Sequence, residues 1–227
     1  MAEVKVPRFM ISAPGSGSGK TTIVCGLLKA LMEKGLSVAA FKSGPDYIDP
    51  MFHSRVIGAK SRNLDLFMLG QATTRYLVAK NARHADVAVF EGAMGFYDGM
   101  GKTTEASAYE LACTCDVPVV LIVNSKGAAL SIAATIKGFK EFRSDSYIVG
   151  AILNNVNPMS YLFYKDVIER ETGVKLLGYF PVMQDCNFES RHLGLVTAEE
   201  IGDLQQIVAK LAAQAAKSVD LDGLLQI

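Results

Sequence analysis

The feature that most constrains the fold is a regular alternation of short apolar runs with segments of helical periodicity. The apolar runs, which are typical of strands buried on both faces, lie at 8–13, 37–42, 86–91, 118–124, 147–154 and 175–180. Apolar residues recur at helical spacing in 20–34, 71–83, 105–115, 129–142 and 160–171, and in a long tail helix over about 197–217. This order predicts one α/β domain with a doubly wound, mostly parallel sheet, covered by helices on both faces.

Composition excludes several classes of protein. The 227 residues are 50% apolar, enough for a full core, and Lys plus Arg balance Asp plus Glu at 23 each. The chain therefore has no net positive charge that would attract nucleic acid or an anionic membrane. No signal-like start and no apolar run of spanning length is present, so we predict a cytoplasmic protein. The four cysteines show no C-x-x-C pair and the three histidines no metal-ligand spacing, which favours free thiols and no zinc site.

The residues after the first run, "SAPGSGSGKTTIV" (12–24), resemble a phosphate-binding loop. The pattern G-x-x-x-x-G-K-[ST] is met at its end, but Pro14 stands where the first glycine is expected. Pro14 occupies a position that must bend but need not donate a hydrogen bond, so its presence weakens the pattern match more than the chemistry. Strand, loop and helix follow in the required order, which predicts a nucleotide site. Its phosphate-binding residues are Gly15, Ser16, Gly17, Ser18, Gly19, Lys20, Thr21 and Thr22.

Four acidic residues, Asp46, Asp49, Glu91 and Asp98, end or follow predicted strands. Ligands bind parallel sheets at the carboxyl edge of the strands, so these side chains are expected at one site. Each alone can be a solvated loop carboxylate, but clustered negative charge is costly unless cations neutralise it. Mg²⁺ prefers oxygen ligands, and the candidates are Glu91, Asp46 and the hydroxyl of Thr21.

Two apolar residues, Tyr47 and Ile48, lie between the aspartates of the second loop. One interpretation is that they pack on the domain beneath them, as most apolar loop residues do. The other is that they form a wall of a pocket for a sizeable apolar substrate.

Seven segments together resemble the synthetase domain of cobyrinic acid a,c-diamide synthases, a P-loop amidoligase branch related to dethiobiotin synthetase. They are "APGSGSGKTT", "KSGPDYIDPMFH", "EGAMGFYDG", "PVVLIVNSKG", "GAILNNV", "GYFP" and "ESRHLGL". The similarity runs from the first strand to "LDGLL" near the C-terminus, and "GPDYIDP" and "ESRHLGL" are far more specific than the phosphate loop. The first glycine of the loop pattern is commonly missing in this family, as it is here.

The resemblance implies a P-loop NTPase-like fold and a ligase that uses ATP and Mg²⁺. Such a ligase converts the a and c side-chain carboxylates of cobyrinic or hydrogenobyrinic acid into amides through an acyl phosphate, in cobalamin biosynthesis. It implies that Lys20 and the loop hold the phosphates, and that Asn154 and the stretch around Pro181 lie at the adenine. The Mg²⁺ ligands that it implies are Thr21, Asp46 and Glu91.

On the substrate side, the resemblance implies that Asp49 and Asp98 serve the activated carboxylate or the incoming ammonia. It also implies that Tyr47 and Ile48 face the macrocycle. Positioning and charge neutralisation by Lys20 and Mg²⁺ are what in-line phosphoryl transfer needs. A carboxylate that accepts a proton from ammonia, in a shielded pocket, completes the chemistry.

Two features depart from the family. Asn124 stands where such proteins usually have Asp, and family members normally continue into a glutamine amidotransferase domain that this sequence does not include. Ammonia is therefore expected from a glutaminase domain or a separate chain. Three alternatives stay open: a nickel-sirohydrochlorin a,c-diamide synthase, a dethiobiotin synthetase-like ligase, and a regulatory ATPase of the deviant phosphate-loop type. The last carries a lysine early in the loop, where this chain has Gly15.

Overall fold

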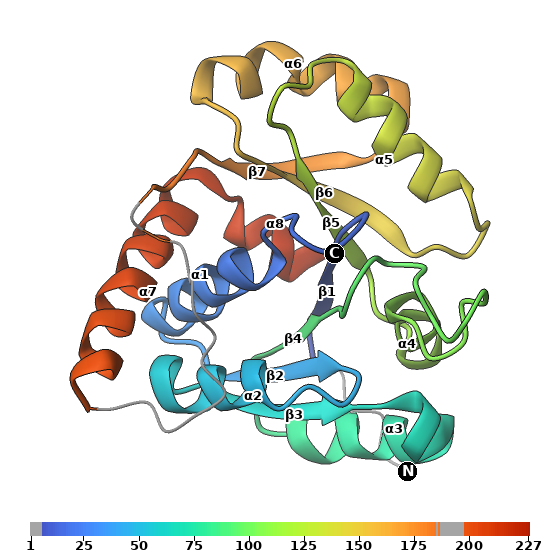
Figure 1. Ribbon diagram of the computed structural model, residues 1–227, viewed down its shortest axis with the longest axis vertical. Helices are drawn as coiled ribbons and strands as arrows, with labels where there is room; N and C mark the ends of the chain where they lie inside the picture. The colour runs from blue at the N-terminus through green and yellow to red at the C-terminus, as the bar shows by residue number, and fades with distance from the viewer. Residues whose placement is uncertain (1–5, 185, 187–197) are drawn as a thin grey trace.

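The computed structural model describes residues 6–184, 186 and 198–227, and these form an α/β domain (Figure 1). Within them, a seven-stranded sheet has the order β3-β2-β4-β1-β5-β6-β7, with every neighbouring pair parallel. The strands are β1 (Arg8–Ser12), β2 (Val38–Ser43), β3 (Lys60–Leu64), β4 (Val87–Glu91), β5 (Val119–Asn124), β6 (Ile148–Asn154) and β7 (Lys175–Phe180). The predicted doubly wound parallel fold is confirmed.

Helices cover both faces of the sheet, as Figure 1 shows. On one face lie α1 (Lys20–Glu33), η1 (His53–Ile57), α7 (Ala198–Ser218) and α8 (Leu221–Gln226), whose buried side chains share one core cluster. On the other lie α3 (Leu66–Ala82), α4 (Ala108–Cys115), α5 (Ser131–Glu141) and α6 (Pro158–Thr172), which share a second. The short helix α2 (Ile48–Phe52) precedes η1, a single π-helical turn. Successive strand residues alternate between the two clusters, as the pleat requires.

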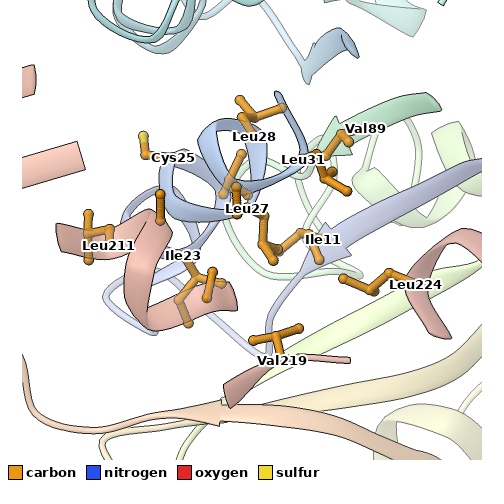
Figure 2. Close-up of a cluster of buried hydrophobic side chains, with 14 of the residues drawn as sticks. Ile11, Ile23, Cys25, Leu27, Leu28, Leu31, Val89, Leu211, Val219 and Leu224 are labelled. Carbon is orange, nitrogen blue, oxygen red and sulfur yellow. The ribbon is translucent and has the colours of Figure 1, made fainter. Parts of the chain in front are cut away.

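The first core cluster fixes α1, and so the end of the phosphate loop, against the sheet. Figure 2 shows side chains from β1, α1, α7 and α8 gathered there, among them Ile11, Leu27, Leu211 and Leu224. A Cβ added at Gly26 would lie 2.9 Å from the backbone oxygen of Leu211, so this glycine permits the close approach of α7 to α1. Packing of this density makes the start of α1 a rigid support for the site.

The strands predicted from apolar runs are found within a residue at each end, but β3 was not predicted. Its sequence KSRNL is polar except for Leu64, because it is an edge strand in which Lys60 and Arg62 are exposed. The helices α2, η1 and α8 were also not predicted, and the predicted start of α3 lies five residues after the observed one. Asp65 begins α3, because its carboxylate accepts from the backbone N–H groups of Phe67 and Met68.

Since all strands run parallel, their carboxyl ends meet at one edge, and the loops that follow them face the same space. The phosphate loop follows β1, the Asp46 loop follows β2, and residues 92–99 follow β4. Asn155 and Pro181 follow β6 and β7 on the other side of β1. Among the described helices, none is both long and apolar enough to cross a membrane.

Candidate active site

The phosphate loop turns from β1 into α1 through two glycines in the left-handed region, Gly17 (φ 76°) and Gly19 (φ 90°). Gly19 is the N-cap of α1 and supplies no side chain to bond the first N–H groups of the helix. The first turn of α1 holds no acidic residue. Open N–H groups and the positive end of the helix dipole form a natural anion site. The loop therefore has the local structure that a phosphate requires.

Lys20, the first residue of α1, is buried, and its side chain crosses the loop. Its Nζ donates to the backbone oxygen of Gly15 at 3.1 Å and to that of Met94 at 2.5 Å. The hydroxyl of Ser18 donates to the same oxygen of Gly15 at 2.9 Å, which tightens the turn. The lysine thus links the phosphate loop to the segment after β4.

A second buried lysine, which was not predicted, organises the acidic side of the site. The Nζ of Lys42, near the end of β2, lies 2.6 Å from Asp49 Oδ2, 2.9 Å from Glu91 Oε1 and 3.8 Å from Asp46 Oδ2. Burial opposes its charge, but the carboxylates of Glu91 and Asp49 outweigh this and raise the pKa of Lys42. Lys42 is therefore a fixed positive charge among three acids.

Glu91, the last residue of β4, is buried at the centre of this network. Its Oε1 accepts a hydrogen bond from the hydroxyl of Thr21 at 2.7 Å, and its Oε2 lies 3.4 Å from His53 Nε2. Burial disfavours the carboxylate, yet Lys42, His53 and Thr21 together lower the pKa of Glu91 to about 2. In contrast, burial and the charge of Glu91 raise the pKa of Asp49 against the pull of Lys42. Glu91 is thus ionised at neutral pH and touches the phosphate loop.

Asp46 shapes the loop after β2. Its Oδ1 accepts from the backbone N–H groups of Ile48 at 2.9 Å and Asp49 at 3.2 Å, a turn typical of aspartate. Its backbone oxygen accepts from the side-chain amide of Asn63 on β3, which ties the loop to the edge strand. This holds Asp46 Oδ2 on the side of Lys42.

These elements line a cleft of about 770 Å³. Ten of the predicted site residues line this cleft. They come from the phosphate loop, from the loop after β2 and from the two segments predicted to lie at the adenine: Ser16, Gly17, Gly19, Lys20, Thr21, Thr22, Asp46, Asp49, Asn154 and Pro181. Gly15 and Ser18 belong to the same loop, and Glu91 lies beneath the cleft, within reach through Thr21. Within residues 6–184, 186 and 198–227, no three His, Cys, Asp or Glu side chains form a complete metal cage.

The family described as "CobQ/CobB/MinD/ParA nucleotide binding domain" matches residues 9–195. This chain belongs to that family. It is also 40% identical over 225 residues to the cobyrinate a,c-diamide synthase of Thermoplasma volcanium, with 99% of the chain and 49% of the relative covered. It is 41% identical over 220 residues to the cobyrinate a,c-diamide synthase of Clostridium acetobutylicum, with 96% and 50% covered.

The chain thus spans about half the length of the curated relatives it matches. Among solved structures, chloroplast FtsY from Physcomitrella patens superposes with a TM-score of 0.58 at 11% identity, covering 91% of this chain and 66% of that one. This likeness shows the fold alone. As a member of the family, the chain is a nucleotide-binding domain.

Three predicted substrate residues lie outside the set that lines the cleft. The side chain of Tyr47 is 76% exposed, and Ile48 is half-buried at the start of α2. Asp98 is exposed, and its Oδ2 accepts from the backbone N–H of Gly95 at 2.9 Å in the loop after β4. All three border the carboxyl edge of the sheet, and their roles stay predictions. The segment "ESRHLGL" (189–195) lies outside the described residues.

Three residues of the site were not singled out from the sequence: Lys42, His53 and Asn155. Lys42 is a charged residue near the end of a run that is otherwise apolar, and this contrast was the available signal. His53 is a buried residue four positions after Asp49, a spacing that points both into one side of a helical segment. Asn155 is the second member of the asparagine pair after β6, and it lines the cleft.

Proposed function

We propose that this chain is the ATP-dependent synthetase unit of a cobyrinate a,c-diamide synthase. In this proposal it amidates the a and c side-chain carboxylates of cobyrinic or hydrogenobyrinic acid with ammonia, through an acyl phosphate. The observation that carries the proposal is a single cleft that joins the phosphate loop to the network of Lys42, Asp49 and Glu91. The relatives named cobyrinate a,c-diamide synthase support the choice of substrate.

The nucleotide of the proposal is ATP with Mg²⁺. The loop N–H groups and Lys20 would bind its phosphates, and Asn154 and Pro181 line the part of the cleft proposed for adenine. Thr21 Oγ1 and Glu91 Oε1 lie 2.7 Å apart, and Asp46 joins them from the loop after β2. This donor set fits Mg²⁺, which usually takes one or two carboxylates and completes its shell with phosphates and water. Bound Mg²⁺ would neutralise charge on the transferring phosphoryl group.

The chain's own residues provide the rest of the chemistry. Lys20 and Lys42 place two positive charges beside the cleft, where a substrate carboxylate and the γ-phosphate would otherwise repel each other. Asp49 lies next to Lys42, and its raised pKa suits a group that accepts a proton from ammonia as it attacks. A cleft of about 770 Å³ holds a nucleotide and a side chain, so the macrocycle would lie at the mouth, toward exposed Tyr47.

The test is to incubate the purified chain with ATP, Mg²⁺ and ammonium across a panel of tetrapyrrole carboxylates. The panel holds cobyrinic acid, hydrogenobyrinic acid and nickel-sirohydrochlorin, and products are identified by mass. We expect a diamide of a corrin substrate, formed in step with ATP hydrolysis and lost in Lys20→Ala. A diamide of nickel-sirohydrochlorin alone would reassign the substrate. ATP hydrolysis without any amide would instead indicate a regulatory ATPase.

A further inference from the structure

A buried histidine beside the site has no part in the reaction proposed above. The imidazole of His53, at the start of η1, lies between the carboxylate of Glu91 and the hydroxyl of Ser61 on β3. Its Nε2 is 3.4 Å from Glu91 Oε2, and its Nδ1 is 3.3 Å from Ser61 Oγ. All three side chains are buried. Among the described residues, Nε2 and Oε2 have no other hydrogen-bond partner, so each relies on the other.

The fold brings these three groups together from separate segments. Ser61 pairs with Ala40 of β2, and Ala40 also pairs with Val89 of β4. Val89 and Glu91 are two residues apart on one strand, so Ser61 and Glu91 point to the same face of the sheet. The element η1 packs in the core cluster on that face, and its π-helical turn begins at His53. Such turns often occur at functional sites.

The two contacts decide how the imidazole ring is oriented. Glu91 is ionised, so its Oε2 can only accept, and the ring must present an N–H at Nε2. A neutral ring then has its lone pair at Nδ1, which accepts from the hydroxyl of Ser61. A protonated ring carries an N–H on both nitrogens, and the hydroxyl accepts instead. In both states His53 donates toward Glu91, and Ser61 holds the ring in this orientation.

The other oxygen of Glu91 is turned toward the phosphate loop. Its Oε1 accepts from Thr21 Oγ1 at 2.7 Å and lies 2.9 Å from Lys42 Nζ. We propose that His53 is a positioning residue for Glu91, which holds Oε2 and so keeps Oε1 beside Thr21 to bind Mg²⁺. Ser61 supports this role by fixing the ring. The role of His53 rests on the proposed function only for the presence of Mg²⁺ with the nucleotide.

Two substitutions of His53 separate its hydrogen bond from its bulk. A hydrogen-bond partner behind a metal ligand typically contributes about 10- to 100-fold to metal affinity. His53→Leu fills the buried space with an apolar side chain but removes the donor to Glu91. His53→Gln retains a donor, because its amide nitrogen is as many bonds from the backbone as Nε2 of the ring. The first variant should lose the support of Glu91, and the second should keep it.

The experiment measures the dissociation constant of AMP-PNP, an ATP analogue that resists hydrolysis, by calorimetry on the full chain. Each protein is measured with Mg²⁺ and with EDTA, and the wild type is expected to bind more tightly with Mg²⁺. His53→Leu should weaken binding with Mg²⁺ on the order of tenfold and leave the value in EDTA unchanged. His53→Gln should stay closer to the wild type. The matched control is His84→Leu, which alters an exposed histidine before β4 and should change neither value.

Four results would overturn the inference. They are a wild type that binds no more tightly with Mg²⁺, a His53→Leu that binds like the wild type, an equal loss in EDTA, and a His53→Gln as weak as His53→Leu. An equal loss in EDTA would show a general distortion of the phosphate loop and not a loss of metal binding.

If His53→Leu does not fold, Ser61→Ala decides the question with a smaller change. It removes the hydroxyl that fixes the ring, so binding with Mg²⁺ should weaken while the value in EDTA stays, and unchanged binding would overturn the inference. Failure of the proposed function is distinguishable, because amidation is measured separately. A chain that follows the expected pattern and yet forms no amide would keep the role of His53 and lose the proposed reaction.

Discussion

The ammonium nitrogen of Lys42 lies 2.9 Å from Oε1 of Glu91; both side chains are buried, and Lys42 lines the cleft. The same nitrogen lies 2.6 Å from Asp49 Oδ2, so one lysine neutralises two carboxylates that would otherwise repel each other. A buried ion pair contributes little net stability against an apolar replacement, but removing one partner leaves an uncompensated charge. The acidic side of the site is therefore an electrostatic unit whose members depend on one another.

Lys42→Met is expected to lower the free energy of unfolding by about 3 to 5 kcal/mol, because it strands Glu91 and Asp49 without their cation. Urea unfolding at pH 7 measures the change. Lys29→Met is the matched control, since Lys29 is part-exposed and pairs with Glu33 in the same helix, and it should change stability by less than about 1 kcal/mol. Equal effects of the two substitutions would contradict the network.

The same network predicts how stability depends on pH. The folded state raises the pKa of Lys42, so its contribution is fully present below the unfolded value of about 10.4 and is lost as pH rises through the folded pKa. The stability difference between wild type and Lys42→Met should therefore stay constant up to about pH 10 and shrink above it, as far as the chain still refolds. Urea unfolding of both proteins at a series of pH values measures this difference in the free energy of unfolding. A difference that grows with pH would contradict the prediction.

Asp46→Asn is expected to raise the Mg²⁺ concentration needed for half-maximal ATP turnover on the order of tenfold, because it removes the charge of a proposed ligand. Asp98→Asn serves as the control. Asp98 is exposed and caps the turn at Gly95, so its substitution should leave the dissociation constant of ATP unchanged and slow product formation only. Loss of ATP binding in Asp98→Asn would contradict the prediction, because it would show that Asp98 serves the nucleotide and not the substrate.

The sequence predicted the layers of the fold well because buried parallel strands are continuous apolar runs. It did not predict β3, since an edge strand with sequence KSRNL exposes polar side chains and lacks such a run. Likewise, the phosphate loop and the acids could be assigned because they are local patterns after strands. Lys42 could not, because its partners Asp49 and Glu91 come together only when β2 pairs with β4 in the observed register. The pairing register of two strands that are distant in the sequence cannot be predicted from either segment alone.

The contact of α1 with α7 can be tested with two glycines. Gly26→Ala should destabilise the chain by about 1 to 3 kcal/mol, because its Cβ would lie 2.9 Å from the backbone oxygen of Leu211. A Cβ at Gly138 in α5 would meet no atom of the described residues within 4 Å beyond its chain neighbours and its own helix backbone, so Gly138→Ala should stabilise by up to about 1 kcal/mol through helix propensity. Thermal unfolding of both variants compares the signs, and a stabilising Gly26→Ala would refute the close packing.

The chain is expected to amidate with free ammonia and to be unable to use glutamine. A glutaminase of the expected kind needs a reactive thiolate with a histidine that deprotonates it. Cys25 and Cys186 are buried, and burial raises the pKa of Cys113 and brings that of Cys115 to about 11. None of the four thiols therefore suits a nucleophile.

The measurement supplies glutamine or ammonium in parallel to the purified chain, with ATP, Mg²⁺ and the corrin substrate. Product should form with ammonium alone, and replacing Cys113 with serine should leave its rate unchanged, because the ammonia route uses no thiol. Glutamine-dependent product with glutamate released in equal amount would show that a thiol of this chain does act as a nucleophile. In that case the loss of glutamine use in one of four single Cys→Ser variants would identify which thiol it is.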